Sequence, residues 1–309
     1  MHLSDQGIAV AAVRYQAQQP VLVACEFMAA GPAERAQVLT KVLGTDGLNG
    51  MRVSTVLNHG EFDLQMIEAP EVAEDELQAA VRWRIKDRLE FDINEAVLDV
   101  FTIPGQQERG RRPMVYVVAA RQERVKQYID ELEGAGADLC CVDIPELAQR
   151  NLAVRLPEDA RGVAMLSLGP DSGLLTLTRE GAIYLARELD VGYRMLESAT
   201  ATADGDSGLQ LEADISPDQQ RAFDTIVLEV QRSLDYFESH FGLPPIGHLA
   251  LAPTPTPLPE MLEYMGSNLG VQIKPLELGE LLEADALPDR RIQAETLLAI
   301  GAALRGPGT

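Results

Sequence analysis

The chain has 309 residues and a formal net charge of −22, with 46% hydrophobic and 24% charged residues. This length exceeds what one compact core usually holds, so two globular domains are expected. The acidic charge excludes a nucleic-acid partner, because phosphate binding needs clustered cations, and the sequence shows neither a secretory signal nor the apolar run of about 18 residues that a transmembrane helix requires.

The first part of the chain alternates short strands with helices. In chain order, the apolar patterns predict strands at 8–13 and 21–27, a helix at 33–42, and strands at 52–58 and 64–67. An amphipathic helix follows, whose apolar stripe is Leu77, Ala80, Val81, Ile85 and Leu89. After it we expect a strand ending at Val100, a polar loop at 106–113, a strand at 114–120, and a helix at 122–133 that Gly134 closes.

The strand pattern restarts after Pro157, which indicates a domain boundary. Strands are predicted at 162–168, 173–178 and 182–188, and an exposed loop at 198–210. Ser216 and Pro217 predict the start of a long helix, whose apolar stripe is Phe223, Ile226, Val227, Val230, Leu234, Phe237 and Phe241. The last predicted elements are a strand at 249–251, a helix from Thr256 to Gly270 with Pro257 in its first turn, a strand at 271–273, and a C-terminal helix.

Several segments resemble the PilM family, the actin-like cytoplasmic proteins of type IV pilus assembly, and within it the MshI-type relatives. The order of elements between Val72 and Leu152 carries most of this resemblance. Four short segments are also similar to the family's motifs, in the family's order: 166–181, 187–192, 231–237 and 298–305. The resemblance covers nearly the whole chain.

The resemblance implies an α/β protein with the two-domain actin-like ATPase fold, which is related to ribonuclease H. The first domain would hold residues 1–155, with a small inserted subdomain at about 72–135. The C-terminal helix, 293–305, would return to this first domain, and residues 156–290 would form the second domain.

The resemblance also places two phosphate loops. Asp5 and Gly7 lie in the first, which lacks the family's DxGxxxxK spacing. The second holds Ser167, Gly169, Asp171, Ser172 and Gly173. Ser167 stands where the metal-facing aspartate is expected, and Pro170 has no N–H to donate to a phosphate.

A third nucleotide segment, which approaches the nucleoside in actin-like proteins, contains Ala252 and Pro253 where a glycine pair is expected. The three departures together predict a degraded nucleotide site and no catalysis. No cofactor is therefore expected, and ATP with Mg²⁺ would bind weakly if it binds. The first loop lies very close to Met1, and whether Met1 is the natural start stays open.

Other catalytic chemistry is not evident in the sequence. The four histidines lack metal-ligand spacing, and neither GxSxG nor GxxxxGK[ST] occurs, so no metal site is expected. Cys25, Cys140 and Cys141 are an odd number, and the last two are adjacent, which favours reduced thiols in the cytoplasm.

Trp83 and its basic neighbours are the candidate partner site. Trp83 lies opposite the apolar stripe of its helix, which leaves two interpretations: burial within the inserted subdomain, or the lining of a groove that binds a partner peptide. The same helical segment carries Arg82, Arg84, Lys86 and Arg88, which form either a solvated face or a docking surface.

The resemblance implies a non-catalytic cytoplasmic scaffold of a type IV pilus assembly platform, of the mannose-sensitive haemagglutinin (MSHA) kind. Its partner would be the cytoplasmic N-terminal peptide of a bitopic pilus-assembly membrane protein, and the assembly motor ATPase would be a second candidate partner. The chain itself would lie at the inner membrane only through these partners. The alternative is an active actin-like ATPase that forms filaments. The sequence leaves the identity of the partner and the oligomeric state open.

Overall fold

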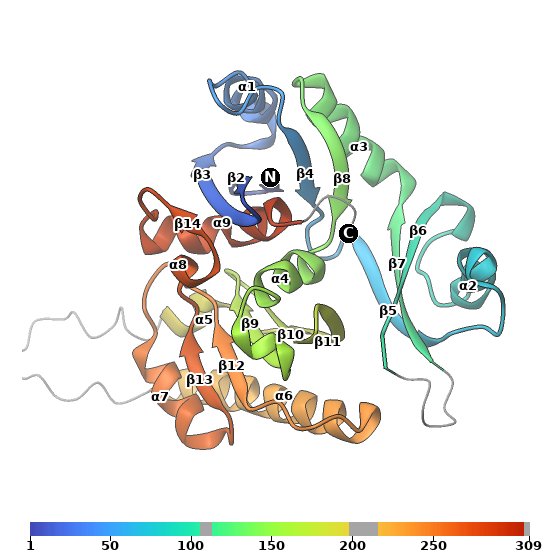
Figure 1. Cartoon of the computed structure of the whole chain (residues 1–309), viewed down its shortest axis with the longest axis vertical. Helices are drawn as coiled ribbons and strands as arrows, with labels where there is room; N and C mark the ends of the chain where they lie inside the picture. Colours follow the sequence, from blue (N-terminus) through green and yellow to red (C-terminus); the bar gives the residue numbers. More distant parts are fainter. Residues whose placement is uncertain (106–112, 198–215, 306–309) are drawn as a thin grey trace, which may run out of the picture. The chain divides into compact units, whose positions relative to one another are not determined.

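The computed structural model describes residues 1–105, 113–197 and 216–305 (Figure 1). The predicted loop at 198–210, and all of the loop predicted at 106–113 except Pro113, lie outside these residues. The chain divides into two compact units. Unit 1 comprises Met1–Val10 and Phe27–Pro145, and unit 2 comprises Ala11–Glu26 and Glu146–Thr309. Compactness does not define the domains of a fold family, so the predicted domain limits stay a prediction.

The main sheet of unit 1 is formed by short strands from both ends of the unit. In the order β2-β1-β4-β8 it contains β2 (Gly7–Gln16), β1 (His2–Ser4), β4 (Arg52–Val56) and β8 (Asp138–Asp143). Strand β1 is antiparallel to β2 and parallel to β4, which is parallel to β8. Strand β3 (Gln19–Ala29) completes the hairpin that begins with β2.

Two helices of unit 1 contact each other beside this sheet (Figure 1). Helix α1 (Pro32–Leu43) begins with a proline in its first turn, where the missing N–H costs nothing. Helix α3 (Gln122–Gly134) buries Tyr128 and Leu132 and leads through a turn into β8. Both helices were predicted, and Gly134 is the last residue of α3 rather than its cap.

A small subdomain of unit 1 comprises residues 62–105 and 113–121. Its three antiparallel strands, in the order β5-β7-β6, are β5 (Phe62–Glu68), β7 (Met114–Arg121) and β6 (Ala96–Thr102). A short 3-10 helix, η1 (Glu74–Glu76), leads into helix α2 (Leu77–Ile85). A second 3-10 helix, η2 (Ile93–Glu95), precedes β6.

Helix α2 packs on one face of this sheet with the predicted apolar residues. Val81 and Ile85 are buried against sheet residues that include Ile67, Leu98 and Val117. The helix ends at Ile85, where the stripe predicted helix as far as Leu89. The backbone turns there, with the Arg88 amide donating to the Ile85 carbonyl, and Leu89 reaches the same core from outside the helix.

Unit 2 is built on a five-stranded sheet in the order β11-β10-β9-β12-β13. Its strands are β9 (Val163–Leu168), β10 (Gly173–Arg179), β11 (Ala182–Leu189), β12 (His248–Leu251) and β13 (Gln272–Pro275). The first three are an antiparallel meander, and β12 pairs in parallel with both β9 and β13. Helix α4 (Pro145–Ala153) precedes this sheet, with the 3-10 helix η4 (Pro157–Ala160) between α4 and β9.

The longest helix, α6 (Pro217–Phe241), follows the sequence pattern closely. Ser216 forms a capping box with Gln219, and Gly242 ends the helix in the left-handed conformation at φ 57°. Phe223, Ile226, Val230, Phe237 and Phe241 of the predicted stripe are buried, and Val227 and Leu234 are half-buried. The short helix α5 (Tyr193–Glu197) contacts α6.

One predicted helix start is wrong. Helix α7 (Pro259–Asn268) begins at Pro259, not at Thr256. Leu258 precedes a proline, which disfavours the helical conformation, and it has φ −121° and ψ 68°. The Thr254 hydroxyl also donates to the Thr256 carbonyl (2.7 Å), so a turn precedes the helix.

The C-terminal helix, α9 (Arg290–Ala303), is the last element of unit 2. Its Thr296 hydroxyl lies 3.0 Å from the Cys25 thiol, and the Tyr15 hydroxyl donates to the carbonyl of Leu304 just after it. The chain reaches α9 through helix α8 (Leu278–Leu281) and strand β14 (Glu283–Ala284), which pairs with β3.

Candidate functional site

The first predicted phosphate loop is a tight hairpin between β1 and β2. Asp5 and Gln6 form its turn, and the Ser4 hydroxyl donates to the Gly7 carbonyl (3.2 Å). Gly7 has φ 156°, and a Cβ there would lie 2.2 Å from the Met28 carbonyl oxygen. The backbone packing of this hairpin therefore requires glycine at position 7.

The second predicted phosphate loop is the β9–β10 hairpin of unit 2, and its Ser167 is engaged inside the protein. The Ser167 hydroxyl donates to Oε1 of Gln149 (2.6 Å). Gln149 is fully buried, and its Nε2 donates to the carbonyls of Met165 (2.8 Å) and Leu174 (3.2 Å) and to the Thr176 hydroxyl (2.9 Å). The amide orientation is fixed by these acceptors, so its oxygen must face residue 167.

The turn of this hairpin forms several hydrogen bonds within the protein. The Gly169 amide donates to the Ser172 carbonyl (2.8 Å), and the Gly169 carbonyl accepts from the Tyr193 amide (2.8 Å). The exposed Asp171 carboxylate pairs with Arg194 (3.0 Å). A Cβ on Gly192 would lie 2.3 Å from the Pro170 carbonyl oxygen, so the chain after β11 is closely packed on the turn.

The third predicted nucleotide segment lies between β12 and α7, and its backbone forms hydrogen bonds within the protein. Ala252 and Pro253 are buried, and the Ala252 amide donates to the Leu166 carbonyl (2.8 Å). The Thr254 carbonyl accepts from Nε of Arg290 (3.0 Å). Thus Ser167, Gly169, Asp171, Ser172 and Gly173 lie in one hairpin of unit 2, while Asp5 and Gly7 lie in unit 1.

Trp83 is the most exposed large apolar side chain among the described residues. Its exposed fraction is 72%, so the interpretation of Trp83 as buried within the subdomain is wrong. The Lys86 ammonium lies over the indole at 5.4 Å from the ring centroid, which is a cation–π contact. Tryptophan is enriched among the residues that dominate binding at protein interfaces, so an exposed one marks a candidate binding surface.

The basic residues around Trp83 divide into two groups. Arg82 is half-buried and donates to the carbonyls of Ile93 (2.8 Å) and Ala96 (3.0 Å), so it holds the small subdomain together. Arg84 is exposed and donates to the Glu68 carbonyl (3.0 Å). Lys86 and Arg88 are exposed, and with Arg84 and Trp83 they form what we call the Trp83 surface.

The sheet face opposite α2 is a second apolar surface. Alternate strand residues point to this face, and Phe101 stacks on Tyr116 with ring centroids 5.2 Å apart. The other apolar side chains of this face that stay half-buried are Phe62, Leu64, Met66, Met114 and Val118. The alternation of these apolar residues along β5 and β7 is the signal in the sequence that could have predicted this face.

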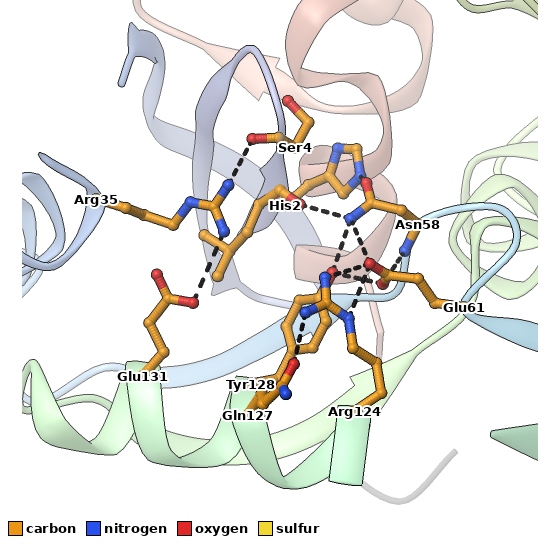
Figure 2. A network of polar contacts seen from close by, with 10 residues as sticks. His2, Ser4, Arg35, Asn58, Glu61, Arg124, Gln127, Tyr128 and Glu131 are labelled. Carbon is orange, nitrogen blue, oxygen red and sulfur yellow. Dashed lines mark hydrogen bonds and ion pairs between the residues drawn. The ribbon is translucent and has the colours of Figure 1, made fainter. Parts of the chain in front are cut away.

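A polar network in unit 1 was not predicted. Figure 2 shows Glu61 at its centre, between the start of α3 and the loop that follows β4. Glu61 accepts from Nε of Arg124 (2.9 Å), from the Tyr128 hydroxyl (2.7 Å) and from the Asn58 amide (2.9 Å). The Asn58 side chain donates to the Tyr128 hydroxyl (2.8 Å) and to the Leu3 carbonyl of β1 (2.8 Å).

The network shifts the ionisation of its members. Burial alone would raise the pKa of Glu61, but the hydrogen bonds from Arg124, Asn58 and Tyr128 outweigh it and hold that pKa below its usual value. Burial, and then the bond to Glu61, raise the pKa of Tyr128. Burial lowers the pKa of His2, whose ring nitrogen lies 3.0 Å from the Asn58 side-chain oxygen, to about 4.

The described residues contain no cluster of His, Cys, Asp or Glu that could hold a metal ion. Cys25, Cys140 and Cys141 all belong to the described residues, and none of the three forms a disulfide. No described helix is long and apolar enough to cross a membrane. The sequence did not predict the roles of Gln149 or of the Glu61 network. These residues belong to no local motif, because their partners lie far away in the chain.

Residues 37–307 match the family model described as "Type IV pilus assembly protein PilM". The chain belongs to this family. Among solved structures, this PilM-family protein is similar to one described as "PilM-PilN type IV pilus biogenesis complex". The two are 23% identical with a TM-score of 0.71, and the match covers 98% of this chain and 96% of the other. The protein therefore has the actin-like ATPase fold.

Two further solved structures are similar to this PilM-family protein. The cytoplasmic domain of EpsL, an inner-membrane component of the type II secretion system of Vibrio cholerae, is 16% identical with a TM-score of 0.49, over 99% of this chain and 94% of that one. EutJ from Carboxydothermus hydrogenoformans is 14% identical with a TM-score of 0.49, over 99% and 88%. No curated protein matches the chain.

Proposed function

We propose that this PilM-family protein is a non-catalytic cytoplasmic scaffold of type IV pilus assembly, which binds a cytoplasmic segment of a membrane-anchored pilus protein. Membership of the family supports the pilus assignment, and a similar structure is described as a complex of PilM with PilN. The exposure of Trp83 carries the proposal of a protein-binding role, because an indole left 72% accessible gains most from burial in a partner.

The Trp83 surface is the proposed contact for this segment. Lys86 and Arg88 add positive charge to an otherwise acidic protein, and they would orient a peptide that carries acidic side chains. Arg84 is exposed, and its guanidinium donates to the carbonyl of Glu68 at the end of β5. This bond connects α2 to the sheet beneath the Trp83 surface. Arg82 is assigned to the interior of the subdomain and not to the partner, because it donates to two backbone carbonyls there.

The non-catalytic part of the proposal rests on how the former phosphate loops use their donors. Ser167 donates to Gln149, and the Gly169 amide donates within its own turn. An unoccupied phosphate cradle would present backbone amides to solvent. Nucleotide would have to break these internal bonds, so we propose that ATP with Mg²⁺ binds weakly or not at all and that no cofactor is needed.

The finer assignments follow the same proposal. We place the protein at an MSHA-type pilus, because its motifs resemble MshI-type relatives. It would lie in the cytoplasm, at the inner membrane through a bitopic partner, with the assembly motor ATPase as a second partner. In cells with several type IV pilus systems, deletion of this gene should abolish MSHA-type pili alone, and loss of another pilus instead would contradict the subtype.

A peptide titration tests the binding role. Synthetic peptides covering the cytoplasmic N-terminal segments of bitopic pilus-assembly proteins are added to the protein, and Trp83, its single tryptophan, reports binding through its fluorescence. Calorimetry then compares variants. Trp83→Ala should weaken binding about tenfold or more. The matched control is Leu228→Ala, which removes an apolar side chain of 48% exposure from α6 and should leave the affinity unchanged.

Two outcomes would contradict the proposed surface. If Trp83→Ala binds like the wild type while Met66→Ala loses the peptide, the partner lies on the sheet face opposite α2. If no peptide binds the wild-type protein, the scaffold role through a membrane-anchored partner is wrong.

Calorimetry with Mg-ATP separates the scaffold from an active actin-like ATPase. The expected result is no heat of binding at nucleotide concentrations that saturate actin-like ATPases, and no phosphate release. Low-micromolar binding with turnover, or nucleotide-dependent sedimentation of filaments, would favour the alternative.

A further inference from the structure

The small subdomain is joined to the rest of unit 1 by two short connections. The incoming connection, residues 57–61, runs from the end of β4 to the start of β5. At the outgoing connection β7 ends at Arg121 and α3 begins at Gln122, with no residue between them. Any change in the tilt of the subdomain relative to the main sheet of unit 1 must therefore be absorbed at these two places.

The Glu61 carboxylate joins the two connections directly. Glu61 itself is the last residue of the incoming connection, and its partners Arg124 and Tyr128 lie in the first two turns of α3, just after the outgoing one. The Glu61 side chain is 16% exposed and that of Arg124 is 38% exposed. Water therefore competes little for Oε2 of Glu61, which accepts from the Tyr128 hydroxyl and the Asn58 amide. Tyr128 is 3% exposed and closes the inner side of the carboxylate.

Asn58 extends the same contacts to the main sheet. Its backbone amide donates to Glu61 (2.9 Å), and its side-chain amide donates to the Leu3 carbonyl in β1 (2.8 Å). Figure 2 shows these groups converging from the β4–β5 loop, from α3 and from β1. Three separate segments of unit 1 are thus held by one carboxylate and one amide.

We propose that Glu61, Arg124, Tyr128 and Asn58 form a clamp that fixes the tilt of the small subdomain on the main sheet of unit 1, and so positions the Trp83 surface for its partner. These residues are positioning residues, because Trp83 lies on α2, outside the network. The positional part stands on the geometry of unit 1 alone, and its effect on the partner rests on the proposed function.

Spin-label distances measured in the full chain test the positional part without any partner. One label is attached to Cys140, an exposed residue of β8, and the other to Asp99→Cys, at an exposed position of β6. Cys25 and Cys141 are replaced by alanine, and circular dichroism confirms folding of each variant. The wild-type clamp should give a single narrow distance distribution.

Two variants open the clamp and one serves as a control. Glu61→Gln replaces one carboxylate oxygen by an NH2 group, which then faces donors of either Asn58 or Arg124, and Tyr128→Phe removes one hydroxyl from the same carboxylate. Both should broaden the distribution about twofold or more. Glu131→Gln, which removes the longer contact of 3.8 Å between α3 and Arg35, should leave it narrow. Unchanged widths in both clamp variants, or equal broadening in the control, would overturn the clamp.

The peptide titration then tests positioning. Glu61→Gln should weaken the peptide roughly three- to tenfold, and in a double-mutant cycle its effect should largely vanish once Trp83→Ala has removed the contact. Strict additivity would mean that the clamp does not act through the Trp83 surface. If the wild type binds no peptide, the proposed function fails, while the spin-label result still decides whether the clamp exists.

Discussion

The β9–β10 hairpin of unit 2 and the small subdomain of unit 1 use their side chains in opposite ways. In the hairpin, Ser167 and Gly169 donate to groups of the protein itself. In the small subdomain, the indole of Trp83 is left in solvent, with the Lys86 ammonium over its ring. Ser167 and Gly169, which already donate within the protein, have little left to offer a ligand. A region with an exposed apolar ring at its surface can gain free energy when a partner buries that ring.

The largest expected effect is on the hairpin side. Gly192→Ala should destabilise the protein by about 3 kcal/mol, because its Cβ would overlap the backbone of the Pro170–Asp171 turn, which cannot move aside as a side chain would. Gly247→Ala is the matched control, since a Cβ there meets no atom within 4 Å. Urea unfolding measures both. Equal stabilities of the two variants would show that the turn is loosely held.

Ser167→Asp should cost about 2–3 kcal/mol, because it places a carboxylate against the Gln149 oxygen, whose orientation three buried acceptors fix. Ser167→Ala, which only leaves that oxygen without its donor, should cost about 1 kcal/mol. Neither variant should bind Mg-ATP by calorimetry. If Ser167→Asp is instead stable and gains nucleotide affinity, the rest of the hairpin can still accept a nucleotide once the aspartate is restored.

Acid should destabilise the protein through His2, which lies beside Asn58, and through Glu61. The native state keeps His2 neutral down to its pKa of about 4, while the unfolded chain takes up that proton near 6.5. The unfolded state therefore binds more protons in this window, and the free energy of unfolding should fall by on the order of 2 kcal/mol as the pH drops from 6.5 to 4. Glu61 adds a second loss of unfolding free energy when the pH falls below its usual pKa, because the folded protein holds the pKa of Glu61 lower than the unfolded chain does.

Urea unfolding at a series of pH values, for the wild type and for His2→Gln, measures this dependence. The variant should show a flatter profile between pH 4.5 and 6.5. Identical slopes would show that His2 is accessible to protons in the native state.

The smallest effect on stability is expected at the Trp83 surface. Trp83→Ala should change the free energy of unfolding by less than about 0.5 kcal/mol, because the side chain is mostly in solvent in both states. A large loss would mean that the indole supports the subdomain and is a poor indicator of a partner. The small subdomain would then use Trp83 for its own stability, as the hairpin uses Ser167.

The sequence alone determined most of the secondary structure, because that depends on local patterns. The Ser216–Pro217 start and the stripe of α6 needed only neighbouring residues, and so did the three strands of the β9–β10–β11 meander. The errors have local causes as well: the proline after Leu258 delayed α7, and a turn after Ile85 shortened α2.

The tertiary structure decided what each polar residue does. Position 83 on a helical wheel is compatible with burial or exposure, and only the placement of α2 on its sheet left the indole in solvent. Gln149 meets Ser167 across 18 positions, and Glu61 meets Arg124 across 63. Such pairs are chosen by how strands and helices pack, and hydrogen bonds between distant residues leave no periodicity in a single sequence. The ordered motifs of the chain therefore indicated the actin-like fold through their resemblance to a family. The hydrogen bond between Ser167 and Gln149, the Glu61 network and the exposure of Trp83 became visible only in the tertiary structure.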